Sequence, residues 1–330
     1  MERSRQSLPG TLERVAGLQT QYAPSGYIGL WSRLENFRRP SLTKSLEQKR
    51  VVQASLMRVT IHMVSKRDYV LFSAGIREAT RTWWLRIQRH AVEADDMKKV
   101  AALLRKHLEK GPLRQAELVK LTMDAGWPRI AWSGAGLWLS MVRVPPSGTW
   151  ERRRADLYGL ADDWIGPLDT ATEEDGLRHL LTRYLRGFGP ATLNDAANWA
   201  GVPLPKLQAV SKRQRLRRFR DDQGKELFDL PRAPLPDPDT PAPVRFLPTW
   251  DAPLLVHARR TQILPEKYRK LVFHTKTPHS VPTFLVDGAV AGTWRYEGDK
   301  VNLNPFAPLS KSILRELNEE AERLAAFHAD

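Results

Sequence analysis

Apolar residues at helical spacing predict two packed helices at the start of the chain. In the second of these, the recurring apolar positions are Tyr27, Leu30, Trp31, Leu34 and Phe37. This spacing predicts an amphipathic helix that begins after Pro24, with Ser25 as its N-cap. A shorter helix precedes it, with Leu12, Val15 and Ala16 facing inward. It is expected to end around residues 18–21, because Pro24 prevents a smooth continuation.

The next apolar pattern changes to strict alternation. In "SLMRVTIHMV", Met57, Val59, Ile61 and Met63 face one way, while Arg58, Thr60 and His62 face the other. This alternation predicts a half-buried strand. Its polar face is either solvated or forms a polar wall beside an anionic groove, in which Arg58 and His62 would contact DNA. Residues 68–90 then predict a helix with the core positions Tyr69, Phe72, Ile76 and Trp83.

The middle of the chain repeats one order of elements. Residues 97–123 predict a helix, a Gly111-Pro112 turn and a second helix, followed by a hairpin whose "PPSG" turn lies at 145–148. Three short helices at 172–187, 191–201 and 203–212 precede a second hairpin that turns near Gln223-Gly224. Helix-turn-helix followed by a hairpin is the order of a winged helix, and its repetition makes a chance pattern less credible.

A different pattern begins after residue 230. Seven prolines between 231 and 248 predict an extended linker. Turns at Asp287-Gly288 and at 297–299 predict an antiparallel meander. A final helix from about Ser310 has acidic residues on its outer face, and its inner positions are Ile313, Leu314, Leu317, Ala321 and Leu324.

These elements predict an α+β fold that is mainly α, with tandem winged-helix motifs and a C-terminal β-rich part. The expected domains are an N-terminal winged-helix-like unit at 1–92, a second winged helix at 93–165 and a third at 166–232. The proline linker, meander and final helix make up 233–330.

The charge of the chain indicates what kind of molecule it binds. The chain has 52 Lys and Arg against 37 Asp and Glu, a net charge of +15 and a pI near 10.2, as expected for a nucleic-acid binder. The densest basic run lies in "SKRQRLRRFR" and contains Lys212, Arg213, Arg215, Arg217, Arg218 and Arg220. A solvated basic face is one interpretation. Phosphate contact is the stronger one, because crowded like charges repel unless a polyanion neutralises them.

Other function classes are excluded by what the sequence lacks. A mean hydropathy of −0.45 and no run of about 20 apolar residues predict a cytoplasmic protein with no membrane partner. The absence of cysteine excludes disulfides, cysteine zinc sites and thiol catalysis. There is no phosphate-binding glycine loop and no H-E-x-x-H, and only His274 and His279 lie close together among eight histidines. We therefore expect neither a metal nor a cofactor.

One short polar motif stands out beside the first helices. Gln19 and Gln21 in "GLQTQYAPSGYIGLWSRL" cannot share a helix face, since two positions are about 200° apart, but they share a side in extended chain. They are either solvated amides or side chains held in place between two packed helices.

This stretch resembles the AlkZ-like winged-helix DNA glycosylase family. So do "SLMRVTIHMVSKRDY", "YLRGFGPATLNDAANWAG" and "LPTWDAPLLVHARRTQILPEKYRKLVF" with the later "FLVDGAVAGTW", in the same order over nearly the whole chain. The resemblance implies a C-shaped assembly that encloses duplex DNA. It also implies that Gln19 and Gln21 are the catalytic residues, in a Gln–aliphatic–Gln motif in which Thr20 replaces the aliphatic residue. Relatives carry a longer first helix before this motif.

The implied activity is hydrolysis of the N-glycosidic bond of cationic N7-alkylated purines, with unhooking of interstrand crosslinks. The implied partner is double-stranded DNA carrying alkylated bases, which a nucleoid-associated monomer would bind. The alternative is a non-catalytic winged-helix DNA-binding protein, either a regulator or a relative that shields lesions. A regulator needs a dimer interface or an effector pocket, and the chain shows no long coiled-coil heptad.

Overall fold

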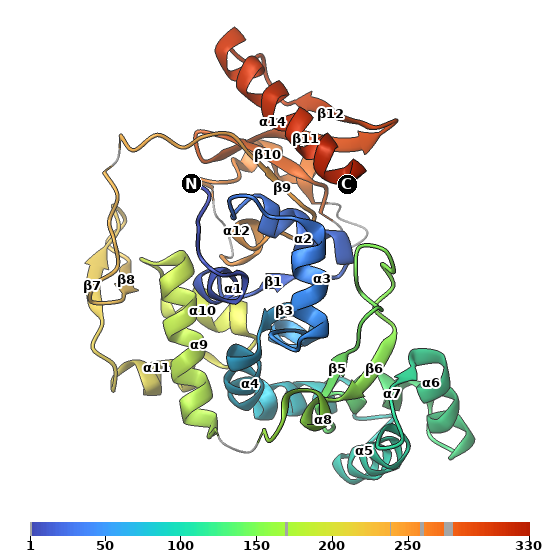
Figure 1. The fold of residues 1–330 in the computed structure, drawn as a ribbon. Helices are drawn as coiled ribbons and strands as arrows, with labels where there is room; N and C mark the ends of the chain where they lie inside the picture. Colours follow the sequence, from blue (N-terminus) through green and yellow to red (C-terminus); the bar gives the residue numbers. More distant parts are fainter. Residues whose placement is uncertain (1, 169–170, 238, 258–260, 274–279) are drawn as a thin grey trace.

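The computed structural model describes residues 2–168, 171–237, 239–257, 261–273 and 280–330. Two units follow the order helix, strand, helix, helix, strand, strand, and a third follows the same order without its first strand. A β-rich part comes after them (Figure 1). The first unit (residues 8–65) lies between the second (94–160) and the third (173–229) (Figure 1). The fold class is α+β with tandem winged-helix motifs, as predicted. The exact domain boundaries stay a prediction.

The first unit places a very short strand between its first two helices. Its elements are α1 (Leu8–Arg14), β1 (Leu18–Gln19), α2 (Ala23–Trp31), α3 (Arg39–Glu47), β2 (Val51–Ser55), the 3₁₀ turn η1 (Met57–Val59) and β3 (Ile61–Ser65). Antiparallel pairing sets Gln19 of β1 opposite His62 of β3. The pairing of the first strand with the third is the arrangement of a winged helix.

Three predictions for this unit are wrong. The first helix ends at Arg14, so residues 18–19 form a strand and not a helix end. Helix α2 begins at Ala23 with Tyr22 at its N-cap, and Ser25 lies inside its first turn, because a proline at the start of a helix lacks only an N–H that needs no intrahelical partner. Residues 57–63 are not one strand, since Arg58 has a left-handed φ of 56° in η1 and β3 starts only at residue 61.

The second unit confirms the two predicted helices and antiparallel pairing of two strands after them, but it adds an unpredicted helix at 129–135, and residues 144–156 connect the strands in place of a tight turn at 145–148. It contains α5 (Ala94–Leu108), β4 (Leu113–Arg114), α6 (Gln115–Asp124), α7 (Arg129–Ala135), β5 (Met141–Arg143) and β6 (Leu157–Leu160). Its sheet joins that of the first unit through the pair Gln53 and Arg143. The result is a six-stranded sheet in the order β1-β3-β2-β5-β6-β4.

The long helix α4 (Lys66–Ile87) links the first two units. Tyr69, Phe72 and Ile76 are buried as predicted, but Trp83 is 41% exposed and its neighbour Trp84 is only 7% exposed. One position along a helix turns the side chain by about 100°, so the core position predicted for residue 83 belongs to residue 84.

The third unit also confirms its predicted helices and hairpin. Short α8 (Ala161–Ile165) leads to α9 (Glu173–Phe188), α10 (Leu193–Ala200), α11 (Leu204–Ser211), β7 (Arg217–Arg220) and β8 (Glu226–Asp229). A single bridge between Ala191 and Phe228 takes the place of the first strand. The hairpin turns at Gly224, whose φ of 77° suits glycine.

An ion network connects the first unit, α4 and the third unit. Buried Asp68 of α4 accepts a hydrogen bond from Arg183 Nε at 2.9 Å, and its Oδ1 lies 2.7 Å from His179 Nε2. Arg183 Nη2 also binds Glu13 of α1 at 2.5 Å. Because a buried charge needs a partner, this network fixes how α9 sits against the first unit.

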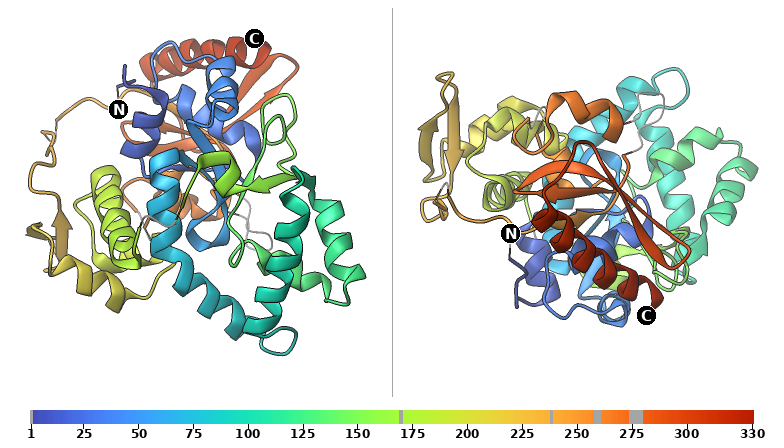
Figure 2. Two further views of the ribbon diagram at one scale, coloured as in Figure 1. Left: turned by 60° about the horizontal axis from the view of Figure 1, so that its bottom comes forward. Right: turned by 90° about the horizontal axis from the view of Figure 1, so that it is seen from above.

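The C-terminal part is a four-stranded sheet covered by one helix (Figure 2). It contains β9 (Arg245–Leu247), α12 (Ala252–Leu255), η2 (Glu266–Tyr268), α13 (Arg269–Val272), β10 (Thr283–Val286), β11 (Ala289–Glu297), β12 (Lys300–Pro305) and α14 (Lys311–Ala329). The predicted turns are confirmed, and so is the start of the final helix near Ser310, which caps α14. One acid of α14 departs from the predicted outer face: Glu320 is buried and pairs with Arg3 at 2.5 Å.

Candidate functional site

The extended backbone at β1 directs Gln19 and Gln21 to one side. Thr20 between them points into the core and is 1% exposed, and its backbone N–H donates to Ile61 O at 2.7 Å. Gln19 is half-buried and Gln21 is exposed. The two amides therefore share a side, as extended chain allows, although they lie on a strand and the loop after it.

Each of the two amide oxygens accepts a hydrogen bond from the protein. Arg58 Nη2 donates to Gln19 Oε1 at 3.0 Å, and the backbone N–H of Ile61 donates to Gln21 Oε1 at 2.6 Å. An amide oxygen has two lone pairs, so one acceptor site on each oxygen is still available. The glutamine side chains are thus oriented by the fold.

Arg58 is itself held by two units. Its Nη1 donates to the carbonyl oxygen of Trp199, at the end of α10 in the third unit. The approach is close, because a Cβ at Gly201 would lie 3.1 Å from Arg58 N. Burial lowers the pKa of Arg58 to about 10, which leaves it cationic at neutral pH. The structure places Arg58 as a support for Gln19, and the predicted DNA contact is not tested.

His62 lies opposite Gln19, but its side chain is buried and is not part of the protein surface. It is 3% exposed, and its Nδ1 lies 3.0 Å from Thr60 O. Burial, together with the nearby Arg58, lowers the pKa of His62 to about 3. The imidazole is neutral at pH 7. Its position does not support the predicted contact with DNA, because alternation along a strand assigns a face but not what covers that face.

The basic run forms an exposed wing on the third unit, away from the glutamines. It extends from the end of α11 through β7 at the left edge of Figure 1. Five of its six cations are exposed and Arg217 is half-buried. Arg213 pairs with Glu174 at 2.9 Å and Arg218 with Glu226 at 3.1 Å. Phosphate contact by this wing stays a prediction.

A second basic segment contacts Tyr22, the residue after Gln21, and was missed by the sequence analysis. Arg152, Arg153 and Arg154 follow Trp150 in the connection between β5 and β6. Arg153 Nη1 donates to the Tyr22 hydroxyl at 2.8 Å, which brings the wing of the second unit against the residue that follows Gln21. The signal in the sequence was three consecutive arginines next to a tryptophan in a hairpin connection.

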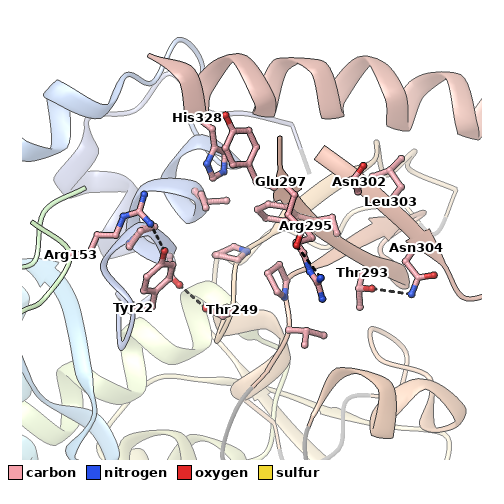
Figure 3. Close-up of a pocket in the computed structure, with 18 of the residues that line it drawn as sticks. Tyr22, Arg153, Thr249, Thr293, Arg295, Glu297, Asn302, Leu303, Asn304 and His328 are labelled. Atoms are coloured by element: carbon pink, nitrogen blue, oxygen red, sulfur yellow. Dashed lines mark hydrogen bonds and ion pairs between the residues drawn. The ribbon is translucent and has the colours of Figure 1, made fainter. Parts of the chain in front are cut away.

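A cavity of about 750 Å³ opens beside Tyr22 (Figure 3). Its walls come from the start of α2, the β5–β6 connection, the strands β11 and β12, and the end of α14. The aromatic residues that line it are Tyr22, Trp150, Trp294, Tyr296 and His328. The sequence analysis assigned no pocket here, since these residues come from separate parts of the chain.

The described residues were also searched for metal-binding groups and for helices that could span a membrane. Among the described residues, no group of three or more His, Asp or Glu side chains could hold a metal ion. The predicted pair His274 and His279 lies outside those residues. None of the helices in the described ranges is long and apolar enough to cross a bilayer.

Three winged-helix units in one chain, joined to a small β-rich part, define a tandem winged-helix protein. The chain belongs to the AlkZ-like DNA glycosylase family, whose family model matches residues 12–327. Its fold is similar to that of Streptomyces sahachiroi DNA glycosylase AlkZ, with a TM-score of 0.82 and 18% sequence identity. That match covers 99% of this chain and 92% of the other. A comparison with curated proteins finds no match.

Proposed function

We propose that this protein is a DNA glycosylase that hydrolyses the N-glycosidic bond of cationic N7-alkylated purines in double-stranded DNA. The family supports a glycosylase acting on DNA. The observation that carries the substrate proposal is the glutamine pair: two neutral amides on one side of an extended segment, each anchored through its oxygen. We assign catalysis to Gln19 and Gln21.

Amide side chains suit a substrate whose base leaves without being protonated by an acid. A purine alkylated at N7 is already positively charged, so it leaves without prior protonation, whereas an ordinary base calls for an acid and a carboxylate. A glutamine side chain supplies neither, because it does not titrate in this pH range. The residues therefore select cationic adducts over uracil or 8-oxoguanine.

The anchored oxygens also define a role in the reaction. The free lone pair of each Oε1 accepts a hydrogen bond from water, and its partial negative charge stabilises positive charge developing on the sugar. The water oxygen then bonds to C1′ as the C1′–N9 bond breaks. The electron pair of that bond neutralises the purine, and the proton of the water passes to solvent. Exposure of Gln21 gives water access to this position.

DNA binding is assigned to two basic segments. The first is Arg152, Arg153 and Arg154, of which Arg153 contacts Tyr22, the residue after Gln21, and the second is the wing of the third unit. Such cations bind phosphates without reading sequence, which suits an enzyme that recognises damage. Hydrolysis at one purine of an N7-to-N7 crosslink would release one strand, so we extend the proposal to crosslink unhooking by a cytoplasmic, nucleoid-associated monomer.

The test is single-turnover release of N7-methylguanine from duplex DNA. Gln19→Ala and Gln21→Ala should each lower the rate by about 10²- to 10³-fold, by analogy with removal of one oxyanion-hole donor. Duplex affinity should change less than about twofold, because neither amide is a charged phosphate contact. Gln48→Ala is the matched control, since Gln48 is an exposed amide at the end of α3.

Other results of this test would contradict the proposed role of the glutamines or the proposed activity. Equal loss of rate and affinity would show that the glutamines only hold DNA, and an unchanged rate would remove them from the reaction. Binding by the unaltered protein without base release would favour a non-catalytic DNA-binding protein.

A further inference from the structure

We propose that Arg143 binds one phosphate of the DNA backbone close to the damaged nucleotide. This inference rests on the proposed function, since it assumes a duplex at the glutamines. It gives the six-stranded sheet a phosphate site of its own, with a binding residue that belongs to neither of the two basic segments. The partners of Arg143, its burial and its place on the sheet support the assignment.

Arg143 of β5 has neutral hydrogen-bond partners among the described residues. Its Nε donates to Ala155 O at 3.3 Å, its Nη1 and Nη2 donate to Ser55 Oγ at 3.5 Å, and Nη2 also donates to the Tyr158 hydroxyl at 3.3 Å. Ordinary N–H···O bonds are shorter, at about 2.7–3.2 Å. A guanidinium has several N–H donors, so this one can still bind an acceptor that carries a charge.

The acidic residue next to Ala155 binds other cations. Asp156 lies 3.3 Å from Arg114 Nη1 and 3.2 Å from Arg154 Nε. Other arginines of low exposure in the described chain pair with carboxylates at 2.5–2.9 Å: Arg3 with Glu320, Arg33 with Asp251, and Arg183 with Glu13 and Asp68. Arg143 differs from them, because within the described ranges no ion pair joins it to an acid.

The guanidinium of Arg143 is also buried, since the residue is 7% exposed. Burial lowers its pKa, and contact with Tyr158 opposes this change. The Tyr158 ring centroid lies 5.1 Å from the guanidinium carbon, a contact that suits a cation without neutralising it. A buried charge without an anionic partner lowers stability, and proteins break such rules mainly at functional sites. We therefore infer that an anion from outside the chain completes this site.

The site opens beside Ser55, at one end of the sheet. Ser55 is the last residue of β2 and is exposed, whereas the residues before it in the strand are buried. Its hydroxyl contacts both terminal nitrogens of Arg143, so an anion that lies over Ser55 reaches them. Guanidinium groups bind phosphate oxygens through paired N–H donors. A phosphate therefore suits both the charge and the access of this site.

A short row of contacts connects this site to Gln21. The Ile61 N–H donates to Gln21 Oε1, and Ile61 pairs with Ser55 in the sheet. Since paired residues on neighbouring strands have Cα atoms about 5 Å apart and the guanidinium lies 3.5 Å beyond the Ser55 hydroxyl, Arg143 is roughly 10 Å from the backbone that holds Gln21. One base step advances about 3.4 Å along DNA. The bound phosphate should therefore lie within about three nucleotides of the damaged one.

The surroundings favour a DNA strand over a free phosphate ion. Ala155, which accepts a hydrogen bond from Arg143, directly follows the basic segment of Arg152, Arg153 and Arg154. A strand carries a row of phosphates and can contact Arg143 and this segment together. A single ion cannot do so.

The experiment replaces single phosphates by uncharged methylphosphonates on both strands, within about three nucleotides of N7-methylguanine. A 2′-fluorine on the damaged nucleotide slows hydrolysis, so that equilibrium affinity can be measured for the unaltered protein and for Arg143→Met. With all phosphates present, Arg143→Met should weaken binding roughly tenfold, as expected for a lost hydrogen bond between charged groups. At one position, the methylphosphonate should weaken binding by the unaltered protein similarly and have no further effect on Arg143→Met.

Two further variants serve as controls. Arg143→Lys keeps a cation that binds phosphate as a point charge, so it should restore most of the affinity. Arg245→Met removes a charge that is similarly buried, since Arg245 is 8% exposed, but from β9 in the C-terminal part. It should respond to every methylphosphonate as the unaltered protein does.

Stability gives a second readout. Arg143→Met removes a buried charge that has no anionic partner in the free protein, so the urea unfolding midpoint should stay unchanged or rise. If Arg143→Met fails to fold, Ser55→Asp takes its place, because it puts a carboxylate beside the guanidinium. Ser55→Asp should raise the unfolding midpoint and abolish the response to the same methylphosphonate.

The outcomes separate this proposal from the proposed function. A lower midpoint for Arg143→Met with no coupled phosphate would overturn the assignment and leave Arg143 as a structural cation. Stabilisation by inorganic phosphate that depends on Arg143, again with no coupled position in the duplex, would assign the site to a free ion and overturn it as well. A coupled phosphate without base release from the duplex lacking fluorine would overturn the glycosylase but support the phosphate site.

Discussion

At the scale of single residues, the burial of a threonine between the two glutamines is unexpected. Thr20 is buried, and its hydroxyl oxygen has no hydrogen-bond partner among the described residues. A methyl group of this residue packs near Gly26, so its apolar half fits the core while its polar half does not. A buried hydroxyl without a partner lowers stability. The family's aliphatic residue at this position therefore has a physical reason.

Thr20→Val should stabilise the protein. Valine has the same shape without the hydroxyl, so we expect the free energy of unfolding to rise by about 1 kcal/mol, measured by urea unfolding. The control is Thr122→Val, because buried Thr122 donates to Leu118 O at 2.8 Å and would lose that hydrogen bond. A lower or unchanged midpoint for Thr20→Val would show that the hydroxyl is satisfied.

Buried His62 predicts how the free energy of unfolding depends on pH. Its pKa is about 3 in the folded chain and about 6.5 when unfolded, so the unfolded chain binds a proton that the folded chain does not. This contribution to stability is complete above pH 6.5 and is lost as pH falls towards 3. Between pH 7 and pH 5, His62 should account for a loss of about 2 kcal/mol.

The measurement is urea unfolding at both pH values for the parent, His62→Asn and His90→Asn. His62→Asn should lose about 2 kcal/mol less than the parent on acidification. His90 is exposed, so its replacement should leave the pH dependence unchanged. An identical pH dependence for the parent and His62→Asn would mean that His62 is not held neutral by burial.

At the scale of elements, two glycines set the distance between the long helices α4 and α9. A Cβ added to Gly176 would lie 2.2 Å from Gly75 N and 2.5 Å from Leu71 O, both backbone atoms that cannot move aside. The helices therefore touch backbone to backbone, next to the ion network of Asp68 and Arg183. Helical periodicity predicted both helices, but it gave no sign of this close crossing.

Gly176→Ala should separate α4 from α9 and destabilise the protein. Overpacking of this kind costs about 1–3 kcal/mol, which thermal unfolding can detect. Gly136→Ala is the control, because its Cβ would meet only Met141 Cε at 3.6 Å and its φ is −62°. Equal unfolding midpoints for the two variants would show that the crossing adjusts without strain.

At the scale of the whole molecule, the positive charge is distributed over separate units. The third unit carries the basic wing, while the second unit brings Arg153 to Tyr22 beside the glutamines. A duplex bound to both would pass the first unit, which lies between them (Figure 1). On the proposed function, affinity should then depend on cations far from the reacting bond.

Replacing Arg215, Arg217 and Arg218 together with alanine should weaken duplex binding and its dependence on salt. Loss of three phosphate contacts should reduce the slope of log K against log salt by about 3. A control with the same change in net charge replaces Lys300, Lys311 and Arg315 in the C-terminal part. If the first triple variant keeps the parent's affinity and slope, the wing does not contact DNA.

Much of the fold could be predicted because it depends on near neighbours in sequence. The helices of the second and third units follow from apolar spacing and caps, and the Asp287-Gly288 hairpin follows from two residues that accept positive φ. The resemblance supplied the glutamine pair, and extended chain predicted its shared side. The errors at Ser25 and Trp83 are shifts of three residues and one residue in helices whose existence was correctly predicted.

The sequence by itself determined the class of fold, the basic character and the motif, since these depend on composition and local periodicity. Only the tertiary structure decided what each side chain meets. Arg153 and Tyr22 are 131 positions apart, and Arg58 contacts Trp199 across 141 positions. The burial that makes His62 neutral, the donors that anchor the glutamines and the aromatic cavity all arise from such contacts. They depend on how whole units pack, which no local pattern records.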